Sequence, residues 1–311
     1  MILGIDISKD KLDVILFPEK KHYIIHNSHQ SIQSFLKTLL KNDRHLEMVV
    51  FEATGGYEKL LMLSLLKLSI PFHRAHPTRV YHFAKSKGYF AKTDRIDAMI
   101  LAQYAAQEDL APSNVSVNQL KLQELSARKT QVKEMIGQER SRLSCTYLNT
   151  KIKQSIQRQM KQLEKEVEWI NEELEDNFKK DQAHDKKRKL LRSIMGVGYE
   201  TSTLLVTDLP ELGQLTREQI SNLIGVAPRT KESGKKQSYR AISHGRSQIR
   251  KVLYMAALVA MRYNNRMKEF YRKLIQAGKK PKVALVAIMR KLIIIMNAMV
   301  RDSLPWQEQR I

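Results

Sequence analysis

The sequence predicts an α/β domain followed by a long all-α region. Over residues 1–112, short apolar runs alternate with helical patterns, which is typical of a sheet covered by helices. Residues 113–189 contain almost no glycine and are rich in Lys, Gln, Glu and Leu, which is typical of long helices. Residues 190–311 contain helical patterns separated by glycine turns. At 311 residues, the chain is long enough for two or three domains.

Three extended segments are expected to open the α/β domain. Apolar runs at residues 1–6, 12–17 and 22–25 predict strands, and a polar turn with a proline joins the second run to the third. A helix is expected at about residues 31–40. The domain therefore begins as a meander of three strands followed by a helix.

Two strand–helix units are expected to complete this domain. The first joins a strand at residues 48–52 to a helix at 57–68, and the second joins a strand at 70–74 to a helix that begins near Asp94. A basic segment precedes the Asp94 helix. This order matches an RNase H-like fold, with a doubly wound nucleotide-binding fold as the main alternative.

Apolar residues recur in steps of three or four through the middle segment: Ile152, Ile156, Met160, Leu163, Val167, Ile170 and Leu174. This spacing is typical of a coiled-coil seam, and a helical hairpin packed on the core explains it equally well. Either way, residues 113–189 are expected to form an arm between two domains and to take part in oligomerisation.

A glycine-rich turn marks the start of the C-terminal region. Residues 190–205 predict two helices joined by Gly196-Val197-Gly198. In such a helix-hairpin-helix-like turn, glycine lets backbone N–H groups approach a phosphate. Plain helix capping produces the same pattern.

Three further helices are expected at about residues 216–224, 248–260 and 282–300. The last is very apolar, but Arg290 and Lys291 interrupt it, which favours a buried helix over a membrane span. No secretory signal is apparent at the N-terminus, and a single cysteine excludes a disulfide framework. These features predict a reducing, cytosolic compartment.

The charge of the chain predicts a polyanionic partner. There are 54 Lys and Arg against 32 Asp and Glu, a formal net charge of +22. Residues 229–301 contain 19 Lys and Arg, with Glu232 and Glu269 as the only acids. A soluble protein with many solvated lysines is the plain alternative, but the concentration of charge favours DNA or RNA.

Four carboxylates are spaced as if to hold metal ions. Asp6 and Glu52 each end an apolar strand, and Asp94 and Asp97 lie three residues apart where a helix should begin. Mg²⁺ prefers oxygen ligands, and two ions about 4 Å apart can clamp both oxygens in phosphoryl transfer. Alone, each residue could be a turn, cap or helix-dipole residue. Together, on a basic chain, they favour a metal site.

The polar stretch at residues 229–245 contains a second candidate for chemistry. Ser233 precedes a glycine and lies among cations, which would stabilise a developing phosphodiester anion if the hydroxyl were activated. Ser238 and Ser243 have equal chemical merit. A basic loop that only grips a nucleic-acid backbone is the alternative.

The segments around these candidate residues resemble the motifs of a known family. Residues 4–9 (GIDISK), 51–57 (FEATGGY) and 92–98 (KTDRIDA) look like motifs of the DEDD insertion-sequence transposases and Piv-type DNA invertases. Four later segments resemble the C-terminal domain of the same family: residues 196–198, 225–229, 233–234 and 249–257. The resemblance covers nearly the whole chain.

The resemblance implies a RuvC-like N-terminal domain, a helical arm, and a C-terminal domain with a nucleophilic serine. Asp6, Glu52, Asp94 and Asp97 match the family's acidic tetrad, which would hold two Mg²⁺ ions, and Ser233 matches its serine. Members of the family recombine DNA, assemble as dimers and tetramers, and in several cases follow a structured guide RNA from the element itself.

We therefore expect a DNA transposase or site-specific recombinase that acts on donor and target DNA at the nucleoid. The tetrad would polarise a scissile phosphate, Ser233 would attack it, and a guide RNA would select the sequence. Residues expected to contact nucleic acid are Lys92, Arg95, Gly196, Gly198, Arg229, Lys235, Lys236, Arg240, Arg246, Arg250 and Lys251.

Three other functions compete with this expectation. A RuvC-like junction nuclease would use the tetrad and water, without a covalent intermediate. A sugar-kinase or actin-like ATPase also opens with Gly-Ile-Asp, but a second Asp-Gly-Thr phosphate loop is missing and the charge is wrong. An architectural DNA-binding protein explains the charge but not the four carboxylates.

Overall fold

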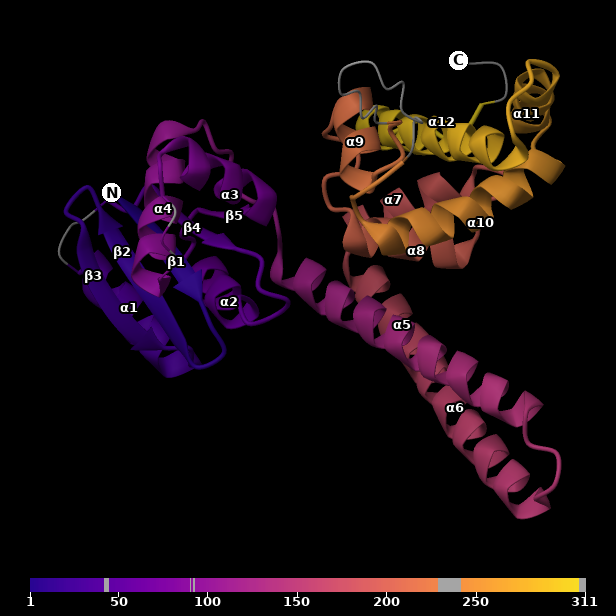
Figure 1. The fold of residues 1–311 in the computed structure, drawn as a ribbon, viewed down its shortest axis with the longest axis horizontal. Coiled ribbons are helices and arrows are strands. Elements are labelled where there is room, and N and C mark those ends of the chain that lie inside the picture. The colour runs from indigo at the N-terminus through magenta and orange to yellow at the C-terminus, as the bar shows by residue number, and fades with distance from the viewer. Residues whose placement is uncertain (42–44, 90, 92, 229–241, 308–311) are drawn as a thin grey trace. The chain divides into compact units, whose positions relative to one another are not determined.

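The computed structural model describes residues 1–41, 45–89, 91, 93–228 and 242–307. The chain forms two compact units, unit 1 (Met1–Val117) and unit 2 (Asn118–Ile311). Figure 1 shows a mixed α/β architecture in unit 1 and helices throughout the described part of unit 2. The predicted combination of an α/β region with an all-α region is therefore confirmed.

Unit 1 is built on a five-stranded sheet in the order β3-β2-β1-β4-β5. The first three strands form an antiparallel meander, and β4 and β5 then add in parallel to β1. The strands are β1 (Ile2–Ile7), β2 (Lys11–Phe17), β3 (Lys21–His26), β4 (Met48–Glu52) and β5 (Phe72–Ala75). All five predicted strands are present, each displaced by at most two residues at its ends.

One face of the sheet is covered by α4 (Asp94–Gln107). The helix lies very close to β1 because Gly4 has no side chain. A Cβ atom at Gly4 would lie 2.2 Å from the carbonyl oxygen of Ala98 and 2.4 Å from the backbone nitrogen of Ala102. Ile15 of β2 is fully buried against the same two alanines. The start of α4 is thereby fixed near the end of β1.

The other face of the sheet is covered by α1 (His29–Leu40) and α2 (Lys59–Lys67), which contact each other. The ring of Tyr23 in β3 packs edge-on against Phe35 of α1, with centroids 5.2 Å apart. Phe51 and Phe72 stack on this face at 5.7 Å. Alternating side chains therefore point to two buried faces, as expected of a sheet between helices.

A helix that the sequence pattern did not predict lies beside α4. Residues expected to form only a basic segment instead form α3 (Pro77–Ser86), which packs on α4. Pro77 is the first helical residue, and the His76 side chain accepts a hydrogen bond from the backbone N–H of Thr78. Proline at this position favours a helix start. The sequence of this basic segment therefore did contain a local signal for a helix.

In its described residues, unit 2 contains a long helical hairpin and six shorter helices, which Figure 1 shows together. The hairpin helices are α5 (Val117–Ser144) and α6 (Thr150–Lys180). The others are α7 (Gln182–Arg192), α8 (Tyr199–Asp208), α9 (Arg217–Ile224), α10 (Ser247–Tyr263), α11 (Asn265–Gln276) and α12 (Pro281–Asp302). Helix α11 was not predicted, although local signals were present: Asn264 is its N-cap, and Met267, Phe270, Tyr271, Leu274 and Ile275 have helical spacing.

The base of the hairpin shares a hydrophobic core with the C-terminal helices. Val132 of α5 and Leu174 of α6 are fully buried in one cluster with Leu253 of α10. Toward the tip, the apolar seam becomes exposed, and Ile152 is 51 % exposed. The base therefore behaves as a hairpin packed on a core, while a coiled coil between copies of the chain stays a prediction.

By length and composition alone, helix α12 could cross a membrane. Its residues Ile288, Leu292 and Met296 are nevertheless fully buried in the core of unit 2. More than half of its apolar window is buried inside the protein. This burial agrees with the predicted core helix.

The packing of α4 on β1 gives a stability prediction. Gly4→Ala should lower the free energy of unfolding by about 3 kcal/mol, because a methyl group has no space between the sheet and α4. Gly137→Ala in α5 is the matched control: its Cβ would meet nothing within 4 Å, so helix propensity should raise stability by about 0.5–1 kcal/mol. Urea unfolding of both variants measures the difference, and equal stabilities would contradict this account of α4.

Candidate active site

The first two carboxylates of the predicted tetrad lie at the same edge of the sheet. In the parallel pair of β1 and β4, Ile5 lies opposite Phe51. Asp6 and Glu52 are the next residues along these two strands, and both are half-buried. Ligands of open α/β sheets commonly bind beyond the carboxyl ends of parallel strands.

The other two carboxylates come from the first turn of α4. The side chain of Thr93 accepts a hydrogen bond from the backbone N–H of Ile96 at 3.2 Å, so Thr93 is the N-cap. Asp94 is therefore the first helical residue and not a cap, and Asp97 follows on the same face. Asp97 directly precedes Ala98, which rests on Gly4.

The structure brings Asp6, Asp97 and Asp94 into electrostatic contact. The pKa of Asp6 is raised from 3.8 to about 6, first by burial, then by the charge of Asp97 and then by that of Asp94. A carboxylate is raised in this way when its charged form is desolvated and surrounded by like charge. The three side chains therefore form an acidic site in which like charges lie close together.

The donor chemistry fits a hard divalent cation. The four predicted side chains offer only oxygen ligands, and a cation would relieve the repulsion that raises the pKa of Asp6. Over the described ranges of the chain, no three His, Cys, Asp or Glu side chains are grouped as ligands of one ion. Binding a metal here would therefore require side-chain movement.

Three further polar residues belong to this site and were missed by the sequence analysis. Asp13 of β2 lies directly opposite Asp6 in the antiparallel ladder and is buried. Its carboxylate lies 3.0 Å from Lys11 Nζ and 2.8 Å from His22 Nε2. Lys11 Nζ also lies 2.7 Å from Asp94 Oδ2. A carboxylate inside an apolar strand was the available signal, because buried charges are rare unless paired.

The loop after Glu52 is held by another missed residue, Glu58. Its buried carboxylate accepts hydrogen bonds from the backbone N–H of Gly56 at 2.8 Å, and from the Thr54 hydroxyl and N–H at 2.9 and 3.3 Å. Arg74 lies 3.8 Å away. Burial alone would raise the pKa of Glu58, but hydrogen bonds from its own backbone N–H and then from Gly56 and Thr54 lower it below its usual value. An ionised Glu58 therefore fixes the turn next to Glu52.

In unit 2, the predicted glycine turn joins α7 to α8. Gly196 has a positive φ of 102° and packs on α10, where a Cβ would lie 2.8 Å from the backbone nitrogen of Ala260. Gly198 is the N-cap of α8, and a Cβ there would meet nothing within 4 Å. The first glycine is thus explained by packing, and the second leaves the N-terminus of α8 accessible.

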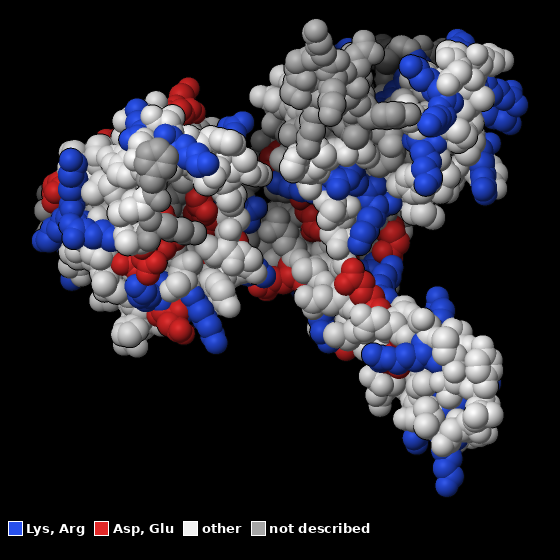
Figure 2. Space-filling view, in the orientation of Figure 1, with Lys and Arg blue, Asp and Glu red and all other residues white. Residues whose placement is uncertain are grey.

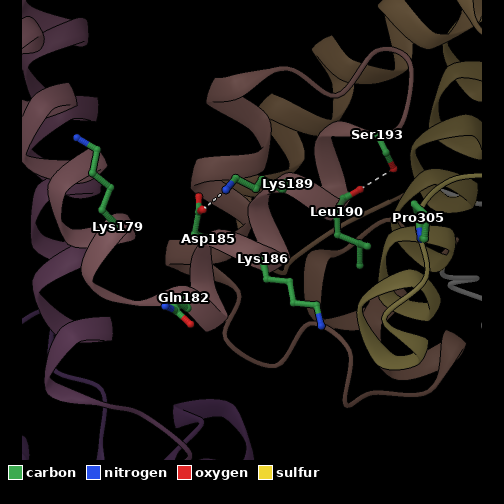
Figure 3. A pocket seen from close by; sticks show the side chains of 8 residues that line it. All are labelled: Lys179, Gln182, Asp185, Lys186, Lys189, Leu190, Ser193 and Pro305. Carbon is green, nitrogen blue, oxygen red and sulfur yellow. Dashed lines mark hydrogen bonds and ion pairs between the residues drawn. The ribbon is translucent and has the colours of Figure 1, made fainter.

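A cationic hollow of about 670 Å³ lies beside α7 (Figure 3). Its lining residues are Lys179, Gln182, Asp185, Lys186, Lys189, Leu190, Ser193 and Pro305. Lys189 is paired with Asp185 at 2.6 Å, and the Ser193 hydroxyl donates to the carbonyl of Leu190 at 2.7 Å. The hollow therefore combines three ammonium groups with one carboxylate, close in sequence to the glycine turn.

The two flanks of the segment that contains Ser233 meet at a pair of glycines. A Cβ at Gly225 would lie 2.1 Å from the carbonyl oxygen of His244, and one at Gly245 would lie 2.5 Å from the backbone nitrogen of Gly225. Both glycines have φ near +70°. Arg250 of α10 donates to the carbonyl groups of Ile224 and His244, on either side of the segment.

Several predicted nucleic-acid contacts have partners within the protein. The Arg246 guanidinium bonds both carboxylate oxygens of Glu211, at 2.8 and 2.5 Å, and the carbonyl of Asp208 at 2.8 Å. Arg95 and Lys251 are exposed. Ser243 is half-buried. Outside the described residues lie Lys92, Arg229, Ser233, Lys235, Lys236, Ser238 and Arg240.

The visible face of unit 2 carries Lys and Arg over α10 to α12, whereas acidic and basic side chains are intermixed on unit 1 (Figure 2). The basic side chains of this region include Arg262, Arg266, Lys268, Arg272 and Lys273. Such a surface favours contact with a polyanion.

Comparisons with known proteins identify transposases and gene-inverting proteins as relatives of this chain. The family model for DEDD transposases of the IS110 type, described as Transposase, matches residues 3–152. A second model, described as Transposase IS116/IS110/IS902 family, matches residues 188–272. The chain is also 29 % identical to the pilin gene-inverting protein of Moraxella lacunata and 28 % identical to that of Moraxella bovis. Each alignment covers 99 % of this chain and 98 % of the relative.

The Glu58 network gives a second prediction. Glu58→Ala should lower stability at pH 7 by about 2 kcal/mol, because the N–H groups of Thr54 and Gly56 lose their charged acceptor. The pKa of Glu58 is lowered in the folded protein, so this contribution exists above about pH 4.5 and fades as the pH falls below it. Glu108→Ala, at an exposed position, should change stability by less than about 0.5 kcal/mol. Chemical unfolding at pH 7 and pH 3 tests this, and a pH-independent loss would contradict it.

The raised pKa of Asp6 gives a third prediction. Because the folded protein favours protonated Asp6, its charge destabilises the metal-free protein as the pH rises from 3.8 through about 6. Solvent screening at this half-exposed site reduces the penalty to about 1–2 kcal/mol. Asp6→Asn should therefore be more stable than the wild type at pH 8 without metal, and equally stable near pH 4. Thermal unfolding in EDTA measures this, and a less stable variant at pH 8 would contradict it.

Proposed function

The chain belongs to the IS116/IS110/IS902 family of transposases and is a DNA transposase or recombinase; on that premise we propose that it cuts and rejoins strands with an acidic tetrad and a serine nucleophile. The coupling of Asp6 to Asp97 and Asp94 at the strand edge carries this proposal. A cluster of carboxylates in which one has a strongly raised pKa is typical of a functional site, and oxygen ligands of this kind hold the metal ions of phosphoryl-transfer enzymes.

Asp6, Glu52, Asp94 and Asp97 would hold two Mg²⁺ ions. Transposases of this type are typically metal-dependent. When bound, such ions polarise the scissile phosphate and stabilise its developing charge. The residues of the chain supply the geometry: Gly4 lets α4 bring its two carboxylates to β1, and Glu58 fixes the turn beside Glu52.

Ser233 would act as the nucleophile. Its Oγ–P bond would form as one P–O bond of the DNA breaks, the serine hydroxyl would lose its proton, and the released DNA oxygen would take up a proton and leave as a hydroxyl end. This phosphoserine link would conserve the bond energy for rejoining. Two observations support this role. Ser233 lies within residues 188–272, which the transposase family model matches, and Gly225, Gly245 and Arg250 hold together the two flanks of residues 229–241. The relatives' name describes inversion of a gene, which also requires cutting and rejoining of DNA.

DNA would bind through the basic surface of unit 2 and through the turn at Gly198, and a structured guide RNA would select the sequence. The protein would act at the nucleoid as a dimer or tetramer. The tip of the hairpin supports assembly through the arm, because Tyr147 is 86 % exposed there and Leu148 is fully exposed.

The fourth prediction tests the two catalytic groups. Asp6→Ala and Ser233→Ala should each lower recombination of a two-site plasmid by at least about 1,000-fold while changing DNA affinity less than about threefold. Ser243→Ala, in the described flank, is the matched serine control and should retain activity.

A covalent protein–DNA adduct should appear on a denaturing gel for the wild type and disappear in Ser233→Ala. Cleavage without an adduct, and with full activity of Ser233→Ala, would instead identify a junction nuclease that uses water.

A further inference from the structure

We propose that Lys11 is an internal counter-cation of the acidic site, which holds Asp94 in the absence of metal and competes with the divalent cation for it. This inference rests on the proposed metal site and adds a residue that controls how readily the site is filled. The observation that carries it is the bridge that Lys11 makes between β2 and the first residue of α4.

The bridge is short on both sides. Lys11 Nζ lies 2.7 Å from Oδ2 of Asp94 and 3.0 Å from Oδ2 of Asp13. The side chains of Lys11 and Asp94 are 42 % and 53 % exposed, whereas that of Asp13 is 5 % exposed. The hydrogen bonds to Asp94 and then to Asp13 raise the pKa of Lys11, so the ammonium is charged at every physiological pH.

Asp13 has the role of an anchor. It is buried, lies opposite Asp6 in the ladder, and has partners on two sides, Lys11 and His22. A buried carboxylate needs such partners, since an unpaired buried charge is costly. Asp13 therefore holds the Lys11 ammonium in place, and the same Nζ also contacts the more exposed Asp94.

The Lys11 ammonium and a metal ion would compete for the carboxylate of Asp94. A divalent cation shared by Asp6, Asp94 and Asp97 would lie within a few ångströms of Lys11, and the two positive charges would repel each other. Lys11 would have to leave Asp94 as the metal enters.

One cation is not enough to neutralise this site. Lys11 supplies one positive charge and divides it between Asp13 and Asp94, while Asp6 lies opposite Asp13 in the ladder and Asp97 follows Asp94 in the same helical turn. The remaining negative charge would still attract a metal ion. Lys11 thus lowers the affinity for metal without abolishing it, which makes the site dependent on the metal concentration.

A purely structural role for Lys11 predicts the opposite effect. If the bridge only oriented Asp94, its loss would leave Asp94 less ordered, and metal binding would weaken. If Lys11 competes with metal, its loss would strengthen metal binding. The sign of the change in metal affinity therefore separates the two roles.

The test is a titration of the full chain with Mg²⁺ alone, at pH 8 and without nucleic acid. Isothermal calorimetry measures the Kd, and thermal unfolding at increasing Mg²⁺ concentration gives a second readout. Lys11→Met should lower the Kd for Mg²⁺ about fivefold, the scale of one exposed ion pair. Lys11→Arg, which keeps the charge, should stay within twofold of the wild type. Lys9→Met removes the same charge from an exposed position in the adjoining turn, and it should also stay within twofold.

The outcomes separate this inference from the proposed function. An unchanged or raised Kd in Lys11→Met, measured on a folded variant, would overturn the competition by Lys11 and leave the metal site intact. An equal gain in Lys9→Met would show a general charge effect and would also overturn it. A wild-type protein that does not bind Mg²⁺ would overturn the metal site itself, and this inference with it.

Discussion

The contact between β1 and α4 is the constraint on which the acidic site depends. Gly4 allows Ala98 and Ala102 to rest on the strand backbone, and this packing sets how far α4 extends along the sheet. Asp6 lies two residues beyond Gly4, and Asp97 directly precedes Ala98. The carboxylates are therefore held together by apolar packing, and the pKa of Asp6 is raised first by burial and then by the charges of Asp97 and Asp94.

Two carboxylates at this edge of the sheet have opposite electrostatic surroundings. Glu58 is buried, yet its pKa is lowered because backbone N–H groups and a hydroxyl donate to it. The pKa of Asp6 is raised first by burial and then by the charges of Asp97 and Asp94, and the donors do not offset these effects. Glu58 is thus satisfied by the protein and stabilises a turn, whereas Asp6 needs a cation from elsewhere. This contrast separates a structural acid from one suited to catalysis.

In unit 2, positive charge is divided between internal and external uses. Arg246 and Arg250 bond carbonyl and carboxylate oxygens of the protein and fix the region where the flanks of residues 229–241 meet. Lys251 and the lysines of the hollow beside α7 remain exposed toward solvent. A net charge of +22 therefore overstates the number of cations available to DNA, although the basic face over α10 to α12 remains large (Figure 2).

The sequence by itself determined the strands, most of the helices and the residue types of the acidic site, because apolar runs, periodicity and caps are local patterns. It placed Asp6 and Glu52 at strand ends and Asp94 and Asp97 on one helical turn. Only the tertiary structure decided that Asp13 is buried and that Lys11 joins it to Asp94. Lys11 and Asp94 lie 83 residues apart. Such a pairing is fixed by how α4 packs on the sheet, which local patterns do not encode.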